Sequence, residues 1–399
     1  MPTDRNREIA YGRHVGMSST HYAHGLGNDL KRPDWPEIRL PELENVLSQF
    51  PSSGSPQDIL WRSPRPFSSA AEVKTSKGSL FVKRHHHSVR SVADLTEEHR
   101  FIGHLRQHHV PVVNILIARN GETAIADDIW TYEVYQPGRG YDFYRDSPSW
   151  TAFAHDSHAF AAGQMLAKFH QAAVTYQAPP RQTKLLVASN SIFGSPDPLR
   201  ILKAELSARP ALARFFSSRS WETDINQRLI IPFHANAYAL LHDEPPLWTH
   251  GDWHASNLLW SSSDNAGHVQ TILDFGLSDR TFALFDLATA IERNLISWLD
   301  AENGSGPVGN LGQLDALLNG YNSVSPLSIR AVKKLSAILP LVHADFALSE
   351  IDYFSGILRN EADAQIAYDQ FLLGHADWFR EREGEVMLGH LDKFARRLS

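Results

Sequence analysis

The chain contains no cysteine among its 399 residues and only 4 methionines. Without cysteine it can form no disulfide, no thiolate metal site and no cysteine nucleophile. No apolar run approaches the roughly 20 residues that a membrane-spanning helix needs. The first eight residues, Met-Pro-Thr-Asp-Arg-Asn-Arg-Glu, also lack the apolar core of a secretory signal. We therefore expect a cytoplasmic protein without a membrane span.

An excess of positive charge is missing as well. The chain has 38 Lys and Arg residues against 45 Asp and Glu residues, a formal net charge of -7. Nucleic-acid backbones require a basic surface, so a nucleic-acid partner is not expected. The acidity mildly favours a neutral or cationic small-molecule partner, although it can also serve solubility alone. Hydrophobic residues make up 42% and charged residues 21%, as in ordinary globular proteins.

One polar constellation indicates phosphoryl transfer. Residues 250–257 read His-Gly-Asp-Trp-His-Ala-Ser-Asn, and Asp274, Phe275 and Gly276 follow an apolar run. Asp252 can accept the proton of an acceptor hydroxyl, while Asn257 and Asp274 can supply oxygen ligands to Mg²⁺ on the phosphates of ATP. The spacing from Asp252 to Asn257 equals that of the protein-kinase catalytic loop H-R-D-x-x-x-x-N, and Asp-Phe-Gly is the metal-binding tripeptide of the same enzymes.

Further motifs resemble the aminoglycoside phosphotransferase and choline kinase family. Gly251 stands where protein kinases have arginine, and Asn257 continues as Leu-Leu-Trp. Residues 286–288, Asp-Leu-Ala, resemble the helix start of this family, and residues 166–172 resemble its L-A-x-L-H-x-A helix. The resemblance spans about residues 58–300. Residues 344–353 are similar to the homoserine-kinase-like branch.

The resemblance implies an α+β, two-lobed protein-kinase-like fold, with a small antiparallel-sheet N-lobe and a larger, mainly helical C-lobe. We expect an N-terminal extension at residues 1–50, with a helix near residues 40–50. The nucleotide-binding N-lobe would occupy residues 51–136, and the C-lobe residues 137–399. Short β-prone runs at residues 59–62, 71–75, 80–84, 123–125 and 130–135 predict the sheet.

Lys83 matches the strand lysine that contacts the α and β phosphates in kinases. Lys74 and Lys77 are competing candidates, and a solvated lysine is the alternative. Its expected partner is Glu98, which shares one helical face with Ile102 and Leu105. Glu97 would point about 100° away, and a solvated glutamate also fits Glu98.

The loop expected to cover the nucleotide, residues 65–70, contains no glycine. Ser68, Ser69 and backbone amides can replace the usual glycines at the phosphates, or the loop is an ordinary turn. By resemblance to the family, the backbones of Glu133 and Tyr135 would hydrogen-bond the adenine.

Several other residues suggest supporting roles. We expect His250 to brace the catalytic loop, His254 to make a hydrogen bond beside it, and His170 to pack in the core. The run at residues 85–87, three histidines, reads as an exposed loop, because adjacent strand residues cannot converge on one metal. Asp286 would begin a helix.

The acceptor site is harder to place in the sequence. Glu292 and Arg293 can face an acceptor cleft or lie on a solvated helix face. The same choice applies to Asp345, Ser349 and Asp352, which share one helical face.

The sequence as a whole predicts an ATP- and Mg²⁺-dependent phosphotransferase that acts on a hydroxyl of a small molecule, and the acidic net charge is compatible with a cationic one. A protein serine/threonine kinase and an inactive nucleotide-binding regulator remain the alternatives, because a fold does not identify its acceptor.

Overall fold

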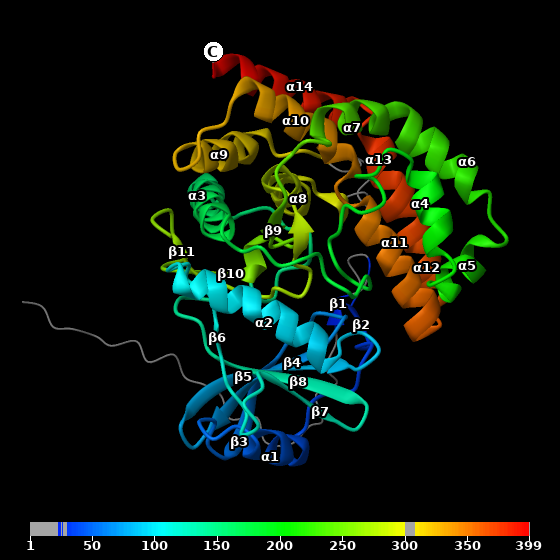
Figure 1. The fold of residues 1–399 in the computed structure, drawn as a ribbon. Coiled ribbons are helices and arrows are strands. Elements are labelled where there is room, and N and C mark those ends of the chain that lie inside the picture. The colour runs from blue at the N-terminus through cyan, green and yellow to red at the C-terminus, as the bar shows by residue number, and fades with distance from the viewer. Residues whose placement is uncertain (1–22, 25, 27–29, 300–307, 399) are drawn as a thin grey trace, which may run out of the picture.

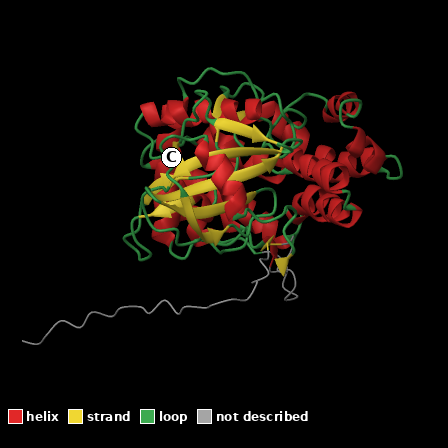
Figure 2. Ribbon diagram, turned by 90° about the horizontal axis from the view of Figure 1, so that it is seen from below, coloured by secondary structure: helices red, strands yellow, loops and turns green. Residues whose placement is uncertain are grey.

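The computed structural model describes residues 23–24, 26, 30–299 and 308–398. It has a smaller lobe built on a sheet and a larger helical lobe, with helix α2 (Val92–Gln107) between them (Figure 1). Figure 2 shows the strands gathered in one part of the molecule, while a group of helices extends beyond them. This architecture confirms the predicted α+β, two-lobed fold.

The smaller lobe contains a six-stranded antiparallel sheet. Its order is β3-β4-β5-β8-β6, and β7 also pairs with β8. The strands are β3 (Pro56–Arg62), β4 (Ser69–Thr75), β5 (Gly78–His86), β6 (Asn114–Ile115), β7 (Ala124–Asp127) and β8 (Trp130–Gln136). The register places Lys83 opposite Ala70 on one side and Glu133 on the other, so Lys83 lies on a central strand.

Helix α1 (Leu40–Ser48) completes the core of this sheet. Leu43, Val46 and Leu47 are buried at spacings of three and one, and they pack in one cluster with Val73 and Val82. The sequence assigned this helix to an extension separate from the N-lobe, but its apolar face belongs to the N-lobe core. The extended arm predicted before it lies largely outside the described residues; a short pair, β1 (Ala23–His24) and β2 (Leu30–Lys31), precedes α1.

The larger lobe is mainly helical. Two short antiparallel pairs lie within it: β10 (Leu258–Trp260) with β11 (Val269–Ile272), and β9 (Leu247–Thr249) with β12 (Asp279–Thr281). Its helices are α3 (Asp156–Ala173), α4 (Pro198–Glu205), α5 (Pro210–Phe216), α6 (Trp221–Ile225), α7 (Ala235–Leu241), α8 (Ala283–Leu295), α9 (Leu311–Asn322), α10 (Ile329–Ile338), α11 (Ala344–Asp352), α12 (Glu361–Ile366), α13 (His375–Trp378) and α14 (Arg382–Arg397).

Wider π-helical turns continue three of these helices: η1 (Asn226–His234), η5 (Tyr353–Leu358) and η6 (Ala367–Gly374). Two 3₁₀ turns are η2 (Ala255–Asn257) and η4 (Leu339–Leu341). One large apolar cluster joins α2 to the helical lobe through Phe101, Phe169, Trp248 and Phe275. Among the described residues no helix combines the length and apolarity needed to cross a membrane.

The predicted histidine loop is wrong. His85 and His86 lie in strand β5, and His85 is buried with its Nε2 2.9 Å from Oε1 of Glu133. Since alternate strand residues face opposite sides of a sheet, Lys83 and His85 share the side on which Glu133 lies.

Candidate active site

The hairpin β10–β11 brings Asn257 and Asp274 to the same end of two paired strands. Leu258 pairs with Ile272, and the backbone N–H of Leu273 donates to the carbonyl of Asn257 at 2.8 Å. Asp274 then adopts a left-handed backbone with φ 51°, an unusual conformation for a residue other than glycine that often marks a functional site. The chain turns there, and the Asp274 carboxylate faces the cleft between the lobes.

The glycine that departs from the protein-kinase pattern has a structural cause. Gly251 has φ 75°, and a Cβ built on it would lie 2.6 Å from the carbonyl oxygen of Leu277 and 2.8 Å from Cβ of Ala188. Only glycine adopts this conformation at no steric cost. The loop that presents Asp252 therefore packs more closely against its neighbours than any side chain at position 251 would allow.

The Asp286 carboxylate anchors the backbone of this loop. Its carboxylate accepts hydrogen bonds from the backbone N–H of His250 at 2.8 Å and of Gly251 at 2.9 Å, and His170 Nε2 lies 3.1 Å away. His250 itself bridges the carbonyl of Leu273 at 2.9 Å and the backbone N–H of Asp252 at 3.2 Å. His250 thus braces the loop. Asp286 lies in the first turn of α8, which begins three residues earlier than predicted, at Ala283, and its carboxylate anchors the loop.

Asp252 is surrounded by groups that keep it ionised. Its Oδ2 accepts from Asn257 Nδ2 at 3.1 Å and lies 3.4 Å from His254 Nε2, and its Oδ1 lies 3.4 Å from Arg293 Nε. Burial alone would raise the pKa of Asp252, but His254 and Arg293 outweigh burial and hold the pKa below its ordinary value. Such a carboxylate orients a hydroxyl group by accepting its hydrogen bond.

Asn257 and Asp274 fit a hard divalent cation. The Asn257 amide nitrogen is used by Asp252, so its oxygen remains available as a ligand. Asp274 holds Lys83 Nζ at 2.8 Å and its side chain is 35% exposed. Its pKa is lowered, because Lys83 outweighs the opposing effect of burial. Carboxylate and amide oxygens are the donors that Mg²⁺ prefers, and both side chains line the same cavity as Asp252.

Lys83 lies in the cleft, but its partner differs from the expected one. The Lys83 ammonium pairs with Asp274, whereas the carboxylate of Glu98 lies 3.5 Å from Nη1 of Arg181. Arg181 also donates to the backbone carbonyls of Gly276 and Asp94. In the described part of the chain, Glu98 therefore contacts Arg181, which in turn holds the segment after Asp274. Glu98 makes no direct contact with Lys83 there, but its negative charge adds to that of Asp274 in raising the pKa of Lys83.

The glycine-free loop places its two serines differently. Ser68 lines the cavity, whereas Ser69 Oγ donates to the carbonyl of Pro36 at 2.9 Å, outside the cavity. The loop also carries Phe67, which meets the ring of Tyr353 edge-on at 5.3 Å. This contact joins the smaller lobe to the C-terminal helices, so the loop covers the cavity.

Strand β8 leaves little room for the adenine contacts assigned to Glu133 and Tyr135. Glu133 pairs with Lys83 on one side and Ala124 on the other, and Tyr135 pairs with Phe81 and Ile115. Their backbones therefore face neighbouring strands, not the cleft. The Glu133 side chain is buried between His85 and His99, whose proximity lowers its pKa against the effect of burial. Phe81, two residues before Lys83, lies on the same face of the sheet, with its ring 6.2 Å from that of Trp61 and 6.5 Å from that of Tyr135.

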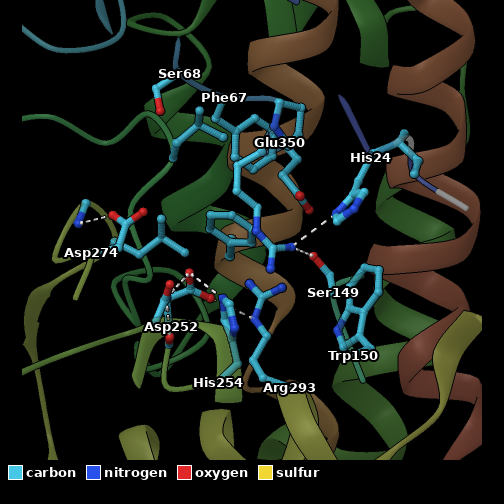
Figure 3. Close-up of a pocket in the computed structure, with 18 of the residues that line it drawn as sticks. His24, Phe67, Ser68, Ser149, Trp150, Asp252, His254, Asp274, Arg293 and Glu350 are labelled. Carbon is cyan, nitrogen blue, oxygen red and sulfur yellow. Dashed lines mark hydrogen bonds and ion pairs between the residues drawn. The ribbon is translucent and has the colours of Figure 1, made fainter. Parts of the chain in front are cut away.

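A cavity of about 140 Å³ unites these groups. Figure 3 shows Asp252 and Asp274 on one side, with Arg293, His254, Trp150 and Glu350 facing the same space. Aromatic side chains form much of the remaining wall: Phe67, Phe346 and Phe371.

Sequence reasoning missed part of this wall. Helix α11 presents Phe346 and Glu350, one turn apart, to the cavity. The face proposed from the sequence serves elsewhere: Asp345 accepts from the backbone N–H groups of Ile192 and Phe193, and Asp352 pairs with Arg209. The spacing of polar residues in α11 is compatible with either face lining the cavity, and only contacts with residues distant in the chain determine which face does so.

Arg65 was also missed. It lies in the loop that the sequence assigned to the nucleotide, and its guanidinium reaches Ser256 Oγ at 2.5 Å, the carbonyl of Ser147 at 3.0 Å and Ser149 Oγ at 3.3 Å. No local pattern distinguishes such an arginine from a surface one, because all of its contacts are distant in the chain.

The model of the phosphotransferase enzyme family matches residues 67–327. No curated protein sequence gives a significant match.

Several solved structures share the fold. An amicoumacin kinase, hAmiN, solved with AMP-PNP, Ca²⁺ and its antibiotic, is similar with a TM-score of 0.56 at 15% identity, covering 84% of this chain and 92% of that one. A microcompartment-associated aminopropanol kinase gives a TM-score of 0.51 at 16% identity, covering 85% and 99%. The aminoglycoside phosphotransferase APH(4)-Ia, solved with ADP and hygromycin B, gives 0.50 at 13% identity, covering 84% and 97%.

Proposed function

Because the chain belongs to the phosphotransferase enzyme family, we propose that it transfers the γ-phosphate of ATP to a hydroxyl group of a small molecule, with Mg²⁺ as the metal. The observation that carries this proposal is the convergence of Asp252, Asn257 and Asp274 on one cavity beside Lys83. The ATP-supplying cytoplasm is the compartment that we propose for it.

Asp252 would receive the hydrogen bond of the acceptor hydroxyl and take its proton as the new bond forms. Phosphoryl transfer is mostly loose in its transition state, so alignment matters more than a strong base. A carboxylate with a depressed pKa is therefore suited to the task. His254 and Arg293 hold Asp252 in place from two sides.

Asn257 and Asp274 would hold Mg²⁺, which when bound neutralises charge on the phosphate oxygens. Lys83 would contact the phosphates, and its bond to Asp274 positions it at the metal side of the cleft. Ser68 would face the phosphates from the covering loop. Phe81 lies where a base could stack, on the face of the sheet that carries Lys83.

The covered cavity favours a small acceptor over a protein. The loop that carries Phe67 closes it by contact with Tyr353. A polypeptide segment would have to displace that contact.

Asp252→Asn and Asp274→Ala separate chemistry from binding. Asp252→Asn should lower kcat by about 100- to 10,000-fold, the usual contribution of a positioned proton acceptor, and leave Mg²⁺-dependent nucleotide binding near the parent value. Asp274→Ala should weaken that binding. Coupled ATP consumption with a panel of alcohols measures the first effect, and calorimetry with Mg²⁺ and AMP-PNP measures the second.

Asp392→Asn, a substitution of an exposed residue on α14, is the matched control and should change neither quantity. Equal nucleotide affinity in the parent, Asp252→Asn and Asp274→Ala would contradict the assigned roles. Nucleotide binding without consumption for any alcohol or protein acceptor would instead identify a regulator, and labelling of protein alone would identify a protein kinase.

A further inference from the structure

The acceptor side of the cavity carries two guanidinium groups. Arg293 projects from helix α8 and lies beside Oδ1 of Asp252, whereas Asn257 binds Oδ2 of the same carboxylate. Arg293 therefore stands on the side of Asp252 away from Asn257. Arg65 enters the same cavity from the covering loop and is tied to Ser256, between Asp252 and Asn257 in the chain.

The guanidinium group of Arg293 is held by aromatic and acidic neighbours on one side and is available to a ligand on the other. Its guanidinium lies 5.1 Å from the ring of Phe346 and 5.8 Å from the ring of Trp150. Behind it, Glu292 is 3.5 Å from Nε and accepts a hydrogen bond from Trp150 Nε1 at 3.0 Å. The two Nη groups of Arg293 donate to none of the described residues, so the forked end that suits a planar anion is left for a ligand.

Arg65 lacks an anionic partner. The four polar contacts of its guanidinium group are with Ser147, Ser149, Ser256 and His24, all of them uncharged groups or a histidine. Burial lowers the pKa of His24 to about 4, so this histidine is neutral at physiological pH. No carboxylate of the described chain lies within ion-pairing distance of Arg65. Asp252 offsets part of the repulsion between the two guanidinium groups, because it lies 3.4 Å from Arg293 and its charge also acts on Arg65. A ligand carboxylate bound by both arginines would offset it further.

Glu350 does not balance these charges. It is 7% exposed and lines the cavity, and its carboxyl group makes no hydrogen bond or ion pair with a described residue. Burial raises its pKa to about 8, despite the proximity of Arg293. At neutral pH the carboxyl is mainly protonated and can donate a hydrogen bond to an anionic oxygen.

We propose that the acceptor is a small hydroxy acid, whose carboxylate is bound by Arg293 and Arg65 and whose carbon chain lies against Phe346 and Phe371. This inference rests on the proposed function and names its substrate class. The acceptor hydroxyl oxygen forms a bond to the γ-phosphorus of ATP, the bond from that phosphorus to the β-phosphate oxygen breaks, ADP leaves, and the hydroxyl proton passes to Asp252. The acidic overall charge favoured a neutral or cationic acceptor, but Arg293 and Arg65 in the cavity favour an anionic one.

The test compares matched compounds. Short straight-chain hydroxy carboxylates are assayed beside the amides of the same acids and amino alcohols of equal length. Phosphorylated product is detected by mass, and binding is measured by calorimetry with Mg²⁺ and AMP-PNP. We expect at least one acid to exceed its amide in kcat/KM and in affinity by about 30-fold or more, as for loss of one partner of a buried charge pair.

Arg293→Gln and Arg65→Gln should reduce that acid-to-amide ratio toward one, mainly through KM of the acid, while KM of ATP changes little. Arg200→Gln is the matched control, because the Arg200 side chain is 67% exposed on α4. It should preserve the ratio. Thermal unfolding of each variant checks that the fold is retained.

Every outcome decides the proposal. It is overturned if no acid binds more tightly than its amide, if amino alcohols are preferred, or if the ratio survives in Arg293→Gln. A rise in KM of ATP alone in Arg65→Gln would assign that arginine to the nucleotide phosphates. Arginine-dependent acid binding without any phosphorylated product would uphold the anion site and overturn the proposed function, whereas turnover of amides alone would do the reverse.

Discussion

Gly251→Ala tests whether the backbone before Asp252 requires glycine. A left-handed backbone costs a residue with a Cβ about 1–2 kcal/mol. The added methyl group would also meet the Leu277 carbonyl at 2.6 Å and Ala188 at 2.8 Å, and overpacking of this kind costs about 1–3 kcal/mol. We therefore expect the free energy of unfolding to fall by about 2–5 kcal/mol, a large part of the roughly 5–15 kcal/mol that stabilises a typical domain.

The cost can also appear in catalysis. If the loop shifts to relieve the contact, Asp252 leaves its position, and each 1.36 kcal/mol of lost transition-state stabilisation lowers kcat about tenfold. Urea unfolding followed by tryptophan fluorescence and steady-state kinetics on the same preparation measure both terms. Gly103→Ala is the control, because Gly103 lies inside α2 with nothing within 4 Å of a built Cβ.

The control variant should be more stable by about 0.5–1 kcal/mol, as expected for a helix-interior position. Parent-like stability together with parent-like kcat in Gly251→Ala would refute the reasoning. So would an equal loss of stability in Gly103→Ala.

Three further predictions concern buried polar groups. Asp286→Asn should lower the free energy of unfolding, measured by urea titration, by about 2–4 kcal/mol, because it weakens the hydrogen bonds from the backbone N–H groups of His250 and Gly251. Unchanged stability would show that the loop does not depend on this anchor. Arg181→Met should cost about 3–5 kcal/mol by the same measurement, since it leaves the buried Glu98 without its cation, and a neutral result would contradict that role. Glu350→Gln should flatten the pH dependence of stability between about pH 4.5 and 8. In the parent the folded state keeps the proton of Glu350 while the unfolded state loses it, so stability should fall with rising pH by up to about 1.4 kcal/mol per unit; an unaltered pH profile in the variant would argue against the raised pKa.

The convergence of Asp252, Asn257 and Asp274 on one cavity could be predicted from the sequence because these residues lie in short, contiguous patterns. Asp252 and Asn257 are five positions apart in one loop, and Asp274 follows a strand that pairs with the strand after Asn257. Alternating and turn-forming residues likewise located the central strands, including the one that carries Lys83.

The remaining contacts are long-range, and no pattern in the sequence specifies them. Glu98 was placed on the correct helical face, but the cation that it meets is Arg181, more than eighty positions away. Ser69 was assigned to phosphate, yet its hydroxyl faces Pro36. Helix α11 offers two polar faces, and packing against residues 189–193 turns Asp345 away from the cavity.

The family match begins at residue 67 and ends at residue 327. Asp252, Asn257 and Asp274 fall inside it, whereas Arg65, Phe346 and Glu350 fall outside. Arg293 and Trp150, which face the same cavity, also fall inside the match. The cavity wall is thus shared between the matched region and the C-terminal helices, so substitutions at Phe346 or Glu350 would reshape one side of the cavity and leave the loop that carries Asp252 unchanged.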